Sequence, residues 1–518
     1  MALIMNSLLM DVAVFLLAMY AAIYVYLVRN FNVWMKKGVP FLKPIAGFGN
    51  FKSVMVGNDS IGSFLKNVYN EAKNKPYVGV FILDQPVLVI RDVDLIKAIL
   101  VKDFHYFADR DFKPDIRTDS LSARSLVGLT GPKWRYMRTT MTPTFTSGKM
   151  KKMFHLVNEC GQELVTYLDS HRVDGCLGVK DAMARFTTDV IASCAFGMQG
   201  KALKEDDSDL RRMLRKIFEF SFSKSLKMAA SKFAPYLLSL FNLQIIDNDV
   251  TDYVRNVVWQ SIEYREKNGV TRNDFLDLLI QIKNKGAVDD EDQTEKSEKK
   301  SPPMELEDDD FVAQAFTFLT AGFETSSTTL SFALYELSLQ PDIQKRLRDD
   351  IQSALAEGDG TVSYEALQRM VYLDQVLSET LRKYPVLPFL DRRSLKPYRL
   401  PGDENIILEK DQTIIIPVLG LHWDPEFFPK PEQFNPEHFS EENKRIRPHY
   451  SYLPFGEGPR NCIGMRMGLM QAKVGLVHIL THFEVSPCEN TPIPLELDPK
   501  SFLLSAKGDL PLNFQPLR

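Results

Sequence analysis

Near the C-terminus the chain reads Phe455-Gly456-Glu457-Gly458-Pro459-Arg460-Asn461-Cys462-Ile463-Gly464, so that one cysteine lies in a loop rich in glycine. Glycine lets backbone N–H groups approach the sulfur closely, and such groups favour a thiolate. The apolar run at residues 465–480 contains no proline and predicts a helix that begins just after Cys462. The free N–H groups and the dipole at the start of a helix also favour negative charge on that sulfur.

Cys462 is therefore a candidate metal ligand. No second cysteine lies near it, and His449 is the only histidine nearby, so the surroundings suit zinc poorly. A single thiolate fits an axial ligand to haem iron. A lone cysteine can also be a small buried apolar residue, and the loop by itself leaves that interpretation open.

The spacing F-x-x-G-x-R-x-C-x-G resembles the haem-binding signature of the cytochromes P-450, and every fixed position of the signature is present. Upstream motifs follow in the family's order: W-x-x-x-R from Trp134, then A-G-x-E-T, E-x-x-R and P-E-x-F. The string M-T-P-T-F-T-S-G-K-M at residues 141–150 is similar to insect microsomal enzymes of this family and to their drug-metabolising vertebrate relatives. By this resemblance the chain is identified as a microsomal cytochrome P-450, a haem-thiolate monooxygenase.

The resemblance implies a mainly α fold, the cytochrome P-450 fold, with a smaller β-rich subdomain and an N-terminal transmembrane helix. The apolar runs at residues 78–83 and 87–90, joined across Asp84-Gln85-Pro86, predict a β-hairpin. Residues 93–284 read as mostly helical. Residues 286–310 predict a charged, solvated surface linker, and residues 311–339 predict a long, buried central helix.

The N-terminus predicts a membrane anchor. Residues 12–28 carry no charge and lie at the lower limit of length for spanning a bilayer. The basic residues Arg29, Lys36 and Lys37 follow, and the positive-inside rule then places the body of the protein in the cytosol. A cleaved signal peptide is the alternative, but it would need a basic start and a cleavage site of small residues. We expect an anchor at 1–30, a basic, proline-rich hinge at 31–50 and a monooxygenase domain at 51–518.

Composition narrows the function classes. The chain has 518 residues, 45% of them apolar and 25% charged, and a net charge of −4, which is typical of globular proteins and gives no reason to invoke nucleic acid. Its five cysteines are sparse and irregularly spaced, so we expect no disulfide framework and a reducing compartment. No glycine-rich dinucleotide loop occurs, so electrons should come from another protein.

The predicted central helix contains Ala321-Gly322-Phe323-Glu324-Thr325-Ser326. Ala321 and Thr325 lie one turn apart on one face, and with Gly322 they leave room for a flat cofactor. The resemblance implies that this stretch crosses the distal face of the haem, with Ala321 against the cofactor. It also implies two catalytic residues, Thr325 as hydrogen-bond donor to the oxygen ligand and Glu324 in the proton-delivery route. The alternative is an ordinary buried helix, in which Thr325 bonds the carbonyl of Ala321 and Gly322 permits close packing.

Glu379 and Arg382 lie three residues apart on a predicted helix at residues 373–384, close enough to pair. The resemblance implies that this pair is buried and locks the segment that carries the haem loop, helped by an arginine from the P-E-R-F motif. Here His438 stands where that arginine is expected. Imidazole can donate to a carboxylate but lacks the fork of a guanidinium, so we hypothesise that His438 weakens the lock.

Several further residues are candidates for binding the cofactor. Trp134 and Arg138 share a helix face, and their N–H groups can bind a haem propionate. By resemblance Arg392 and Arg460 are further propionate ligands, and Phe455 is expected beneath the haem near the sulfur. For each arginine an exposed salt bridge is the alternative.

Two segments, residues 104–129 and 217–246, are expected to form the substrate pocket and its entrance. The second is rich in large apolar side chains: Phe218, Phe220, Phe222, Phe233, Leu237, Leu238, Leu240 and Phe241. At helical spacing such residues are often core. In an anchored protein they can instead contact lipid and admit apolar substrates.

The resemblance implies haem b, iron protoporphyrin IX held by Cys462, and insertion of one oxygen atom from O₂ into a small apolar substrate. That substrate would be a xenobiotic, such as a plant toxin or insecticide, or an endogenous lipid or hormone. Electrons from NADPH would arrive through NADPH–cytochrome P-450 reductase, with cytochrome b5 as a further partner. Candidate basic contacts for the reductase are Arg135, Lys149, Lys151, Lys152 and Arg466.

With the anchor, these expectations place the protein in the endoplasmic reticulum membrane, with its catalytic domain on the cytosolic, microsomal face. Two other classes stay open. One is a peroxide isomerase or dehydratase of the same fold that needs no reductase, and the other is a haem carrier or sensor without turnover. Retention of Glu324 and Thr325 argues against both.

Overall fold

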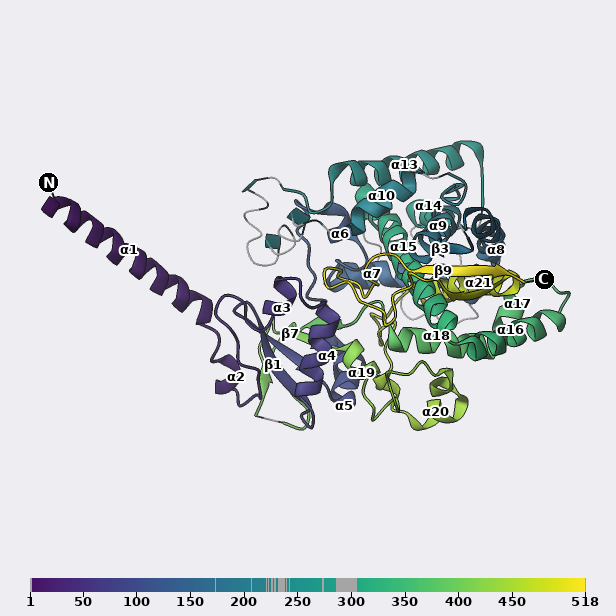
Figure 1. Ribbon diagram of the computed structural model, residues 1–518. Helices are drawn as coiled ribbons and strands as arrows, with labels where there is room; N and C mark the ends of the chain where they lie inside the picture. Colours follow the sequence, from purple (N-terminus) through teal and green to yellow (C-terminus); the bar gives the residue numbers. More distant parts are fainter. Residues whose placement is uncertain are drawn as a thin grey trace.

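The structure is a computed structural model. It describes residues 2–285 and 305–517, apart from residues 173, 206, 220, 222, 225, 226, 228, 229, 232–237, 239, 242, 273 and 404. A long N-terminal helix projects from a body in which a smaller β-rich part adjoins a larger helical part (Figure 1). The predicted fold class, mainly α with a smaller β-rich part, is confirmed.

The helices of the first half of the chain are α1 (Ala2–Val28), α2 (Val33–Lys36), α3 (Lys52–Met55), α4 (Ile61–Glu71), α5 (Val93–Lys97), α6 (Ser120–Arg124), α7 (Gly131–Met141), α8 (Ser147–His171), α9 (Val179–Ile191) and α10 (Asp209–Phe218). Those of the second half are α13 (Asn248–Asn268), α14 (Phe275–Lys285), α15 (Asp308–Leu339), α16 (Pro341–Ala356), α17 (Tyr364–Arg369), α18 (Val371–Lys383), α19 (Val418–His422), α20 (Glu441–Ile446) and α21 (Met465–His482). Short 3-10 or π turns lie at η1 (Ala98–Lys102), η2 (Phe104–Tyr106), η3 (Thr142–Phe145), η4 (Ala192–Phe196), η5 (Pro436–Phe439) and η6 (His449–Ser451).

The strands are β1 (Tyr77–Ile82), β2 (Gln85–Ile90), β3 (Cys176–Gly178), β4 (Leu390–Arg393), β5 (Tyr398–Arg399), β6 (Ile407–Leu408), β7 (Thr413–Ile416), β8 (Phe483–Pro487) and β9 (Pro511–Pro516). The largest sheet has the order β1-β2-β7-β4. β1 and β2 pair antiparallel from Tyr77 opposite Ile90, which confirms the predicted hairpin. β4 pairs antiparallel with β7, so that Arg392 lies opposite Ile414 at one edge of this sheet.

Helix α15 is the centre of the helical part, and α6, α9, α18 and α21 pack against it. Asp308, Asp309 and Asp310 form its first turn, although the sequence predicts them as the end of the charged linker. The helix therefore begins three residues earlier than predicted. Acidic side chains suit the positive end of a helix, and Glu307 and Asp310 form a reciprocal capping box. The rest of the predicted linker, residues 286–304, lies outside the described residues.

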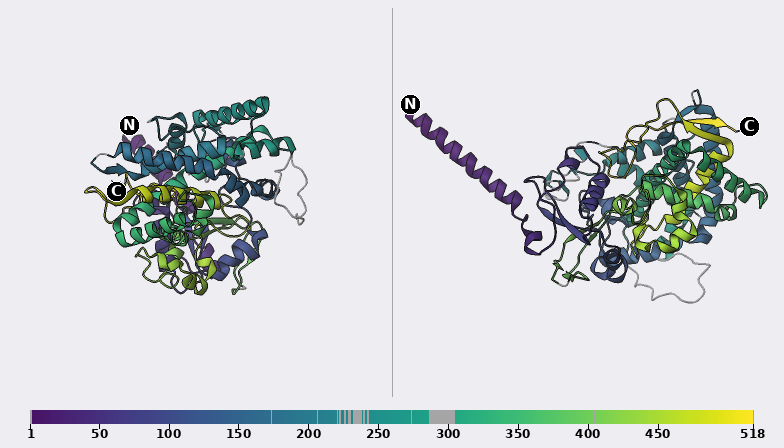
Figure 2. Two further views of the ribbon diagram at one scale, coloured as in Figure 1. Left: turned by 90° about the vertical axis from the view of Figure 1, so that its right-hand side faces the viewer. Right: turned by 60° about the horizontal axis from the view of Figure 1, so that its bottom comes forward.

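The N-terminal helix has the length and composition of a membrane span. Residues Met10–Val28 have a mean hydropathy of 2.1, and none of this stretch is buried in the body. The right-hand view of Figure 2 shows α1 extending away from the rest of the protein. These properties fit the anchor predicted at residues 12–28.

The sequence predicts no disulfide framework, but one disulfide is present: Cys176 is bonded to Cys488, with their Cα atoms 6.3 Å apart. β3 and β8 pair with opposite edges of β9, and both Cys176 and Ser486 lie opposite Asn513. The sheet therefore joins two cysteines that lie far apart in the sequence. Cys160 and Cys194 are free and buried, and Cys462 is free.

This pairing predicts the pattern of thiol alkylation. In denatured protein that has not been reduced, iodoacetamide should modify Cys160, Cys194 and Cys462 but neither Cys176 nor Cys488, because a disulfide sulfur is not a nucleophile. Peptide mass spectrometry measures the modification. In a Cys176→Ser control, Cys488 should become reactive, and reaction of both cysteines in unreduced wild-type protein would contradict the disulfide.

Candidate active site

The loop that carries Cys462 is held in a narrow turn. The backbone N–H of Cys462 donates to the carbonyl of Phe455 at 2.8 Å, which closes the loop just before α21 begins at Met465. Gly456 and Gly458 have φ values of 69° and 77°, in the left-handed region that favours glycine. A Cβ atom on Gly458 would also overlap the carbonyl oxygen of Leu100. This glycine is therefore required both by its backbone conformation and by the close approach of the η1 turn.

The Cys462 side chain is accessible, yet protein atoms surround it closely. Burial raises the pKa of its thiol, while the Gly464 N–H, Arg138 and Arg110 favour the thiolate. Burial is the largest of these influences, so the loop and the helix do not by themselves lower the pKa of the Cys462 thiol. A side chain that is accessible although protein atoms surround it lies next to a space inside the protein. A metal ion in that space could deprotonate the sulfur.

The middle of α15 is more accessible than the stretches of the helix that flank it. Ala321 is exposed, whereas residues 310–316 and 326–338 are buried. The hydroxyl of Thr325 donates to the carbonyl of Ala321 at 2.6 Å, as the ordinary-helix alternative predicted. The central helix therefore opens onto space at the motif that the sequence identified. With its proton used in this bond, Thr325 must rotate before it can donate to a ligand.

Gly322 has the role that the ordinary-helix alternative gave it. A Cβ atom at this position would overlap the side chain of Ile191 at the end of α9, so Gly322 permits close packing of α15 against α9. The amide of Gln471 on α21 donates to the Gly322 carbonyl at 3.1 Å, which ties the helix after the cysteine loop to this part of α15. It is Ala321, and not Gly322, that faces open space.

Glu324 is largely buried on α15, and desolvation raises the pKa of its carboxyl group. Lys180 and Arg211 are the charged groups that oppose this shift. A carboxyl group that is costly to ionise can retain a proton at neutral pH and release it when a neighbour needs one. This property suits the predicted place of Glu324 in a proton route.

Buried guanidinium groups gather near the cysteine loop. Arg392 is 2% exposed and Arg460 is 4% exposed, so the exposed-salt-bridge alternative is wrong for both. Desolvation and the charge of Arg110 lower the pKa of Arg392 to about 9 and that of Arg460 to about 10. The Nε atoms of Arg110, Arg392 and Arg460 are buried and have no hydrogen-bond partner among the described residues. Such a cluster requires additional negative charge.

Arg110 is the member of this cluster that sequence reasoning missed. It lies in the segment 104–129, and no motif marks it. Two carboxylates lie close to the arginine cluster. Asp109 contacts Arg460 at 3.4 Å, and Asp391 accepts from the backbone N–H of Asp111 at 2.6 Å. A group with two carboxylates, such as haem, fits this excess of positive charge.

Trp134 and Arg138 lie on α7 as predicted, but Arg138 also supports the loop. Its guanidinium donates to the carbonyl and side-chain oxygens of Asn461 at 2.8 and 2.6 Å. The guanidinium of Arg460 lies over the ring of Trp134, 4.7 Å from its centroid. Phe455 is half-buried. The structure thus brings Trp134, Arg138 and Arg460 together around the cysteine loop.

Glu379, Arg382 and His438 form one buried group. Arg382 donates to both oxygens of Glu379 at 2.7 Å, and neither side chain is exposed to solvent. His438 Nδ1 lies 3.1 and 3.2 Å from the same oxygens, and its Nε2 lies 2.9 Å from the carbonyl oxygen of Pro429. Both ring nitrogens face oxygen acceptors, so both can donate only when the imidazole is protonated. His438 therefore occupies the third place of the group.

The two predicted entrance segments meet. The backbone N–H of Ile245 donates to the carbonyl of Thr118 at 3.3 Å, and the Gln244 amide donates to the carbonyl of Arg117 at 3.3 Å. The ring of Phe218, at the end of α10, lies 6.0 Å from that of Phe323 on α15. The predicted apolar residues Phe220, Phe222, Phe233 and Leu237 lie outside the described residues.

Comparisons with known proteins agree with the geometry. A family model described as Cytochrome P450 matches residues 39–512. Cytochrome P450 6j1 of Blattella germanica is 45% identical over 509 residues, and the match covers 98% of each chain. Cytochrome P450 6a2 of Drosophila melanogaster is 42% identical over 517 residues, covering 98% of this chain and 100% of the relative.

The two left-handed glycines of the cysteine loop provide a matched pair of variants. Both Gly456→Ala and Gly458→Ala place a side chain at positive φ, which costs about 1–3 kcal/mol. A Cβ atom has room at position 456 but overlaps Leu100 at position 458. Gly458→Ala should therefore lower the midpoint of thermal unfolding further than Gly456→Ala does. Equal midpoints for the two variants would contradict the packing of this loop.

His438 can be tested in both directions. His438→Ala should lower the thermal unfolding midpoint, since loss of a buried hydrogen-bond partner costs about 1–3 kcal/mol. If the imidazole makes a weaker lock than a guanidinium, His438→Arg should raise the midpoint and slow the loss of cofactor. A His438→Arg protein that unfolds at a lower temperature than wild type would show that the hypothesis of a weakened lock is wrong.

Proposed function

The chain belongs to the cytochrome P450 family, and we propose that it is a membrane-bound haem-thiolate monooxygenase that acts on small apolar substrates. Family membership rests on the match over residues 39–512 and on relatives that align along nearly the whole chain. One observation in particular supports the proposal. The Cys462 side chain and Ala321 in the middle of α15 are both accessible, and near the cysteine loop lie buried arginines whose Nε atoms have no hydrogen-bond partner among the described residues.

In this proposal haem b lies between Cys462 and α15. Cys462 would hold the iron through its sulfur, and Ala321 and Phe455 would contact the cofactor. Trp134, Arg138, Arg392 and Arg460 bind the propionates, together with Arg110. When bound, the haem supplies activation of O₂ at its iron, and the thiolate ligand favours cleavage of the O–O bond.

Two residues of α15, Glu324 and Thr325, would hold and deliver protons beside the cofactor. Desolvation raises the pKa of the Glu324 carboxyl group, while the charges of Lys180 and Arg211 oppose the shift, and a raised pKa favours a residue that holds and passes on a proton. The Thr325 hydroxyl, which donates to the Ala321 carbonyl, would have to turn from that bond to donate toward a bound cofactor.

The substrate class follows from the apolar entrance. Phe218 and Phe323 face each other between α10 and α15, while Leu240 and Phe241, further along the entrance segment, are 73% and 65% exposed. Apolar side chains of this kind bind apolar molecules and do not orient polar ones. We propose xenobiotics such as plant toxins or insecticides, or endogenous lipids and hormones, as substrates.

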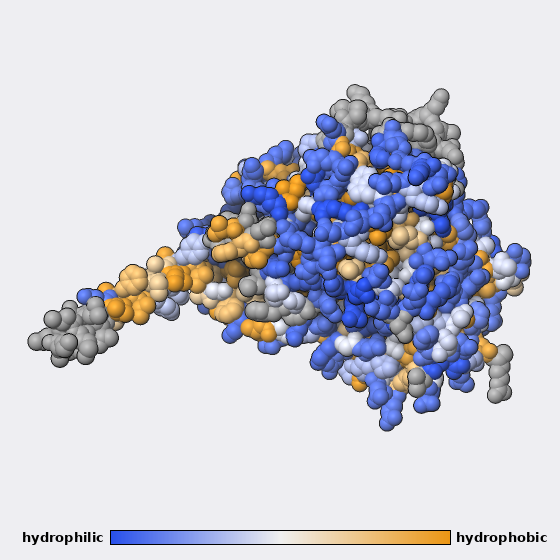
Figure 3. All heavy atoms as spheres, turned by 90° about the horizontal axis from the view of Figure 1, so that it is seen from above, coloured by the Kyte–Doolittle hydropathy of each residue, from blue (hydrophilic) through white to orange (hydrophobic). Residues whose placement is uncertain are grey.

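We further propose three parts, an anchor at 1–30, a hinge at 31–50 and the catalytic domain at 51–518, located at the cytosolic face of the endoplasmic reticulum. Figure 3 shows apolar residues along α1 and on the adjoining part of the body. Exposed side chains close to the anchor include Met35, Ile45, Met55 and Val56. They extend the apolar surface of the anchor and favour contact of this end of the body with lipid.

Electrons would come from NADPH through NADPH–cytochrome P-450 reductase, with cytochrome b5 as a second donor. The candidate basic residues lie on three elements: Arg135 on α7, Lys149, Lys151 and Lys152 at the start of α8, and Arg466 at the start of α21. Lys151 also pairs with Glu365. Arg466 donates to the carbonyl of Phe145 at 3.1 Å, which links α21 to the turn before α8. Clustered positive charge attracts an acidic partner.

Reconstitution tests this function. The full chain, combined with reductase, lipid, O₂ and NADPH, should oxidise an apolar probe such as 7-ethoxycoumarin, and removal of reductase or NADPH should abolish product formation. Arg135→Glu should slow reduction several-fold at low salt, since charge complementarity raises association rates, and the effect should shrink as salt screens the charges.

Lys410→Glu is the control, because Lys410 is exposed just before β7, in the β-rich part of the molecule. Reduction rates that ignore both salt and Arg135→Glu would contradict electrostatic docking. Peroxide isomerisation without NADPH or reductase would instead support the isomerase alternative.

A further inference from the structure

The first turns of α15 make polar contacts with three other elements. These contacts come from Asp309, Asp310 and Gln314, which we call the acidic latch. Their partners lie in the segment 104–129, on α7 and on α13. This segment includes α6 and forms one wall of the proposed entrance.

Asp310 is fully buried, and its carboxylate is surrounded by donors. Lys133 of α7 lies 2.8 Å from it, and Arg124 of α6 lies 3.3 Å from it. It also accepts from the backbone N–H of Glu307 at 3.0 Å. The carboxylate lies away from solvent. Removal of its charge would therefore leave Lys133 and Arg124 without the partner that they share.

Asp309 joins α6 to α13. The guanidinium of Arg255 donates to both of its oxygens at 3.0 and 3.1 Å, and the hydroxyl of Ser120 donates to it at 3.1 Å. Arg255 also donates to Ser120 at 3.0 Å, which closes a ring of three side chains from three elements. The bond from Arg255 lowers the pKa of Asp309, so this carboxylate is ionised at neutral pH.

Gln314 fixes the backbone that follows α6. Its amide nitrogen donates to the carbonyl of Arg124 at 2.8 Å, and its oxygen accepts from the N–H of Leu126 at 3.1 Å. A few residues further along, Arg460 donates to the carbonyls of Val127 and Leu129 at 3.1 and 2.5 Å. The C-terminal part of the segment is thus attached both to α15, through Arg124 and Leu126, and to the cysteine loop, through Val127 and Leu129.

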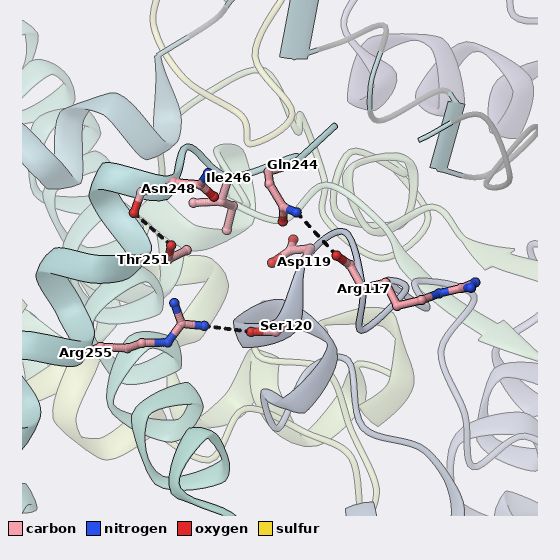
Figure 4. Close-up of a pocket in the computed structure, with 8 residues that line it drawn as sticks. All are labelled: Arg117, Asp119, Ser120, Gln244, Ile246, Asn248, Thr251 and Arg255. Atoms are coloured by element: carbon pink, nitrogen blue, oxygen red, sulfur yellow. Dashed lines mark hydrogen bonds between the residues drawn. The ribbon is translucent and has the colours of Figure 1, made fainter. Parts of the chain in front are cut away.

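Next to the latch the two entrance segments do not pack tightly. A cavity of about 240 Å³ separates them, lined by Arg117, Asp119, Ser120, Gln244, Ile246, Asn248, Thr251 and Arg255. Figure 4 shows that polar side chains form most of its wall and that Arg255 and Ser120 bond at its edge. The bond between Arg255 and Ser120, and the bonds of both to Asp309, lie at the edge of this pocket and hold α6 against α13 and α15.

We propose that the acidic latch holds the segment 104–129 closed against α13 and α15, and that its opening limits how fast apolar ligands enter and leave the interior. Asp309 and Asp310 are then positioning residues that control access and do not touch the reacting atoms. The inference rests on the proposed function, because it takes the interior space to be the substrate site. It goes beyond that function by assigning the control of access to identified ion pairs.

Hydrogen exchange tests the latch without any cofactor signal. In the full-length protein, Asp309→Asn and Arg255→Gln should each raise exchange of the amides of residues 112–129 by about tenfold, the effect of about 1.4 kcal/mol. Asp308→Asn is the matched control, since Asp308 is exposed in the same turn and has no such partner within the part of the chain that the structure describes. Asp310→Asn should have the largest effect. If it fails to fold, the two milder variants decide.

Ligand kinetics test the consequence. Stopped-flow spectra of oxidised protein with 1-phenylimidazole should show faster dissociation in Asp309→Asn and Arg255→Gln, by a similar factor, and no change in Asp308→Asn. Exchange and dissociation rates equal to wild type in both latch variants would overturn the latch. Absence of any spectral change in every protein, wild type included, would instead refute the proposed haem site, while the exchange data would still report on the latch.

Discussion

Burial of Arg392 and Arg460 beside Arg110 and Arg138 is costly unless negative charge lies among them, and the rest of the site depends on this requirement. The described carboxylates nearby, Asp109 and Asp391, do not balance the cluster, and several buried Nε atoms have no partner. A group that brings two carboxylates to these arginines and a metal to the Cys462 thiol meets both needs together. Haem has that composition, so electrostatics and ligation favour the same cofactor.

The surrounding contacts hold that interior in shape. Arg138 supports the cysteine loop through Asn461, and Arg460 ties the same loop to the segment after α6. Glu379, Arg382 and His438 fix the region before the loop from a different side. The acidic latch adds a polar joint at the start of α15. Firm contacts thus surround the thiol, while the joint beside the polar cavity is the part most easily opened.

The sequence predicted what local pattern and spacing determine. Long apolar runs marked α15 and α21, two short apolar runs separated by a turn marked the β1–β2 hairpin, and the spacing around Cys462 marked the cysteine loop. Features that depend on tertiary contacts were missed or left open. Arg110 carries no motif, Cys176 and Cys488 meet only because β3 and β8 flank β9, and the choice between the two interpretations of Gly322 depends on which side of α15 faces Ile191.

The central claim is that the sulfur of Cys462 ligates haem iron, and the spectrum of the reduced protein with carbon monoxide tests it most directly. The full-length protein, loaded with haem and reduced by dithionite, should show the red-shifted Soret band that thiolate ligation gives. Cys462→His, which replaces the thiolate with an imidazole, should lose that band. A fully haem-loaded wild-type protein with an unshifted band would contradict the account.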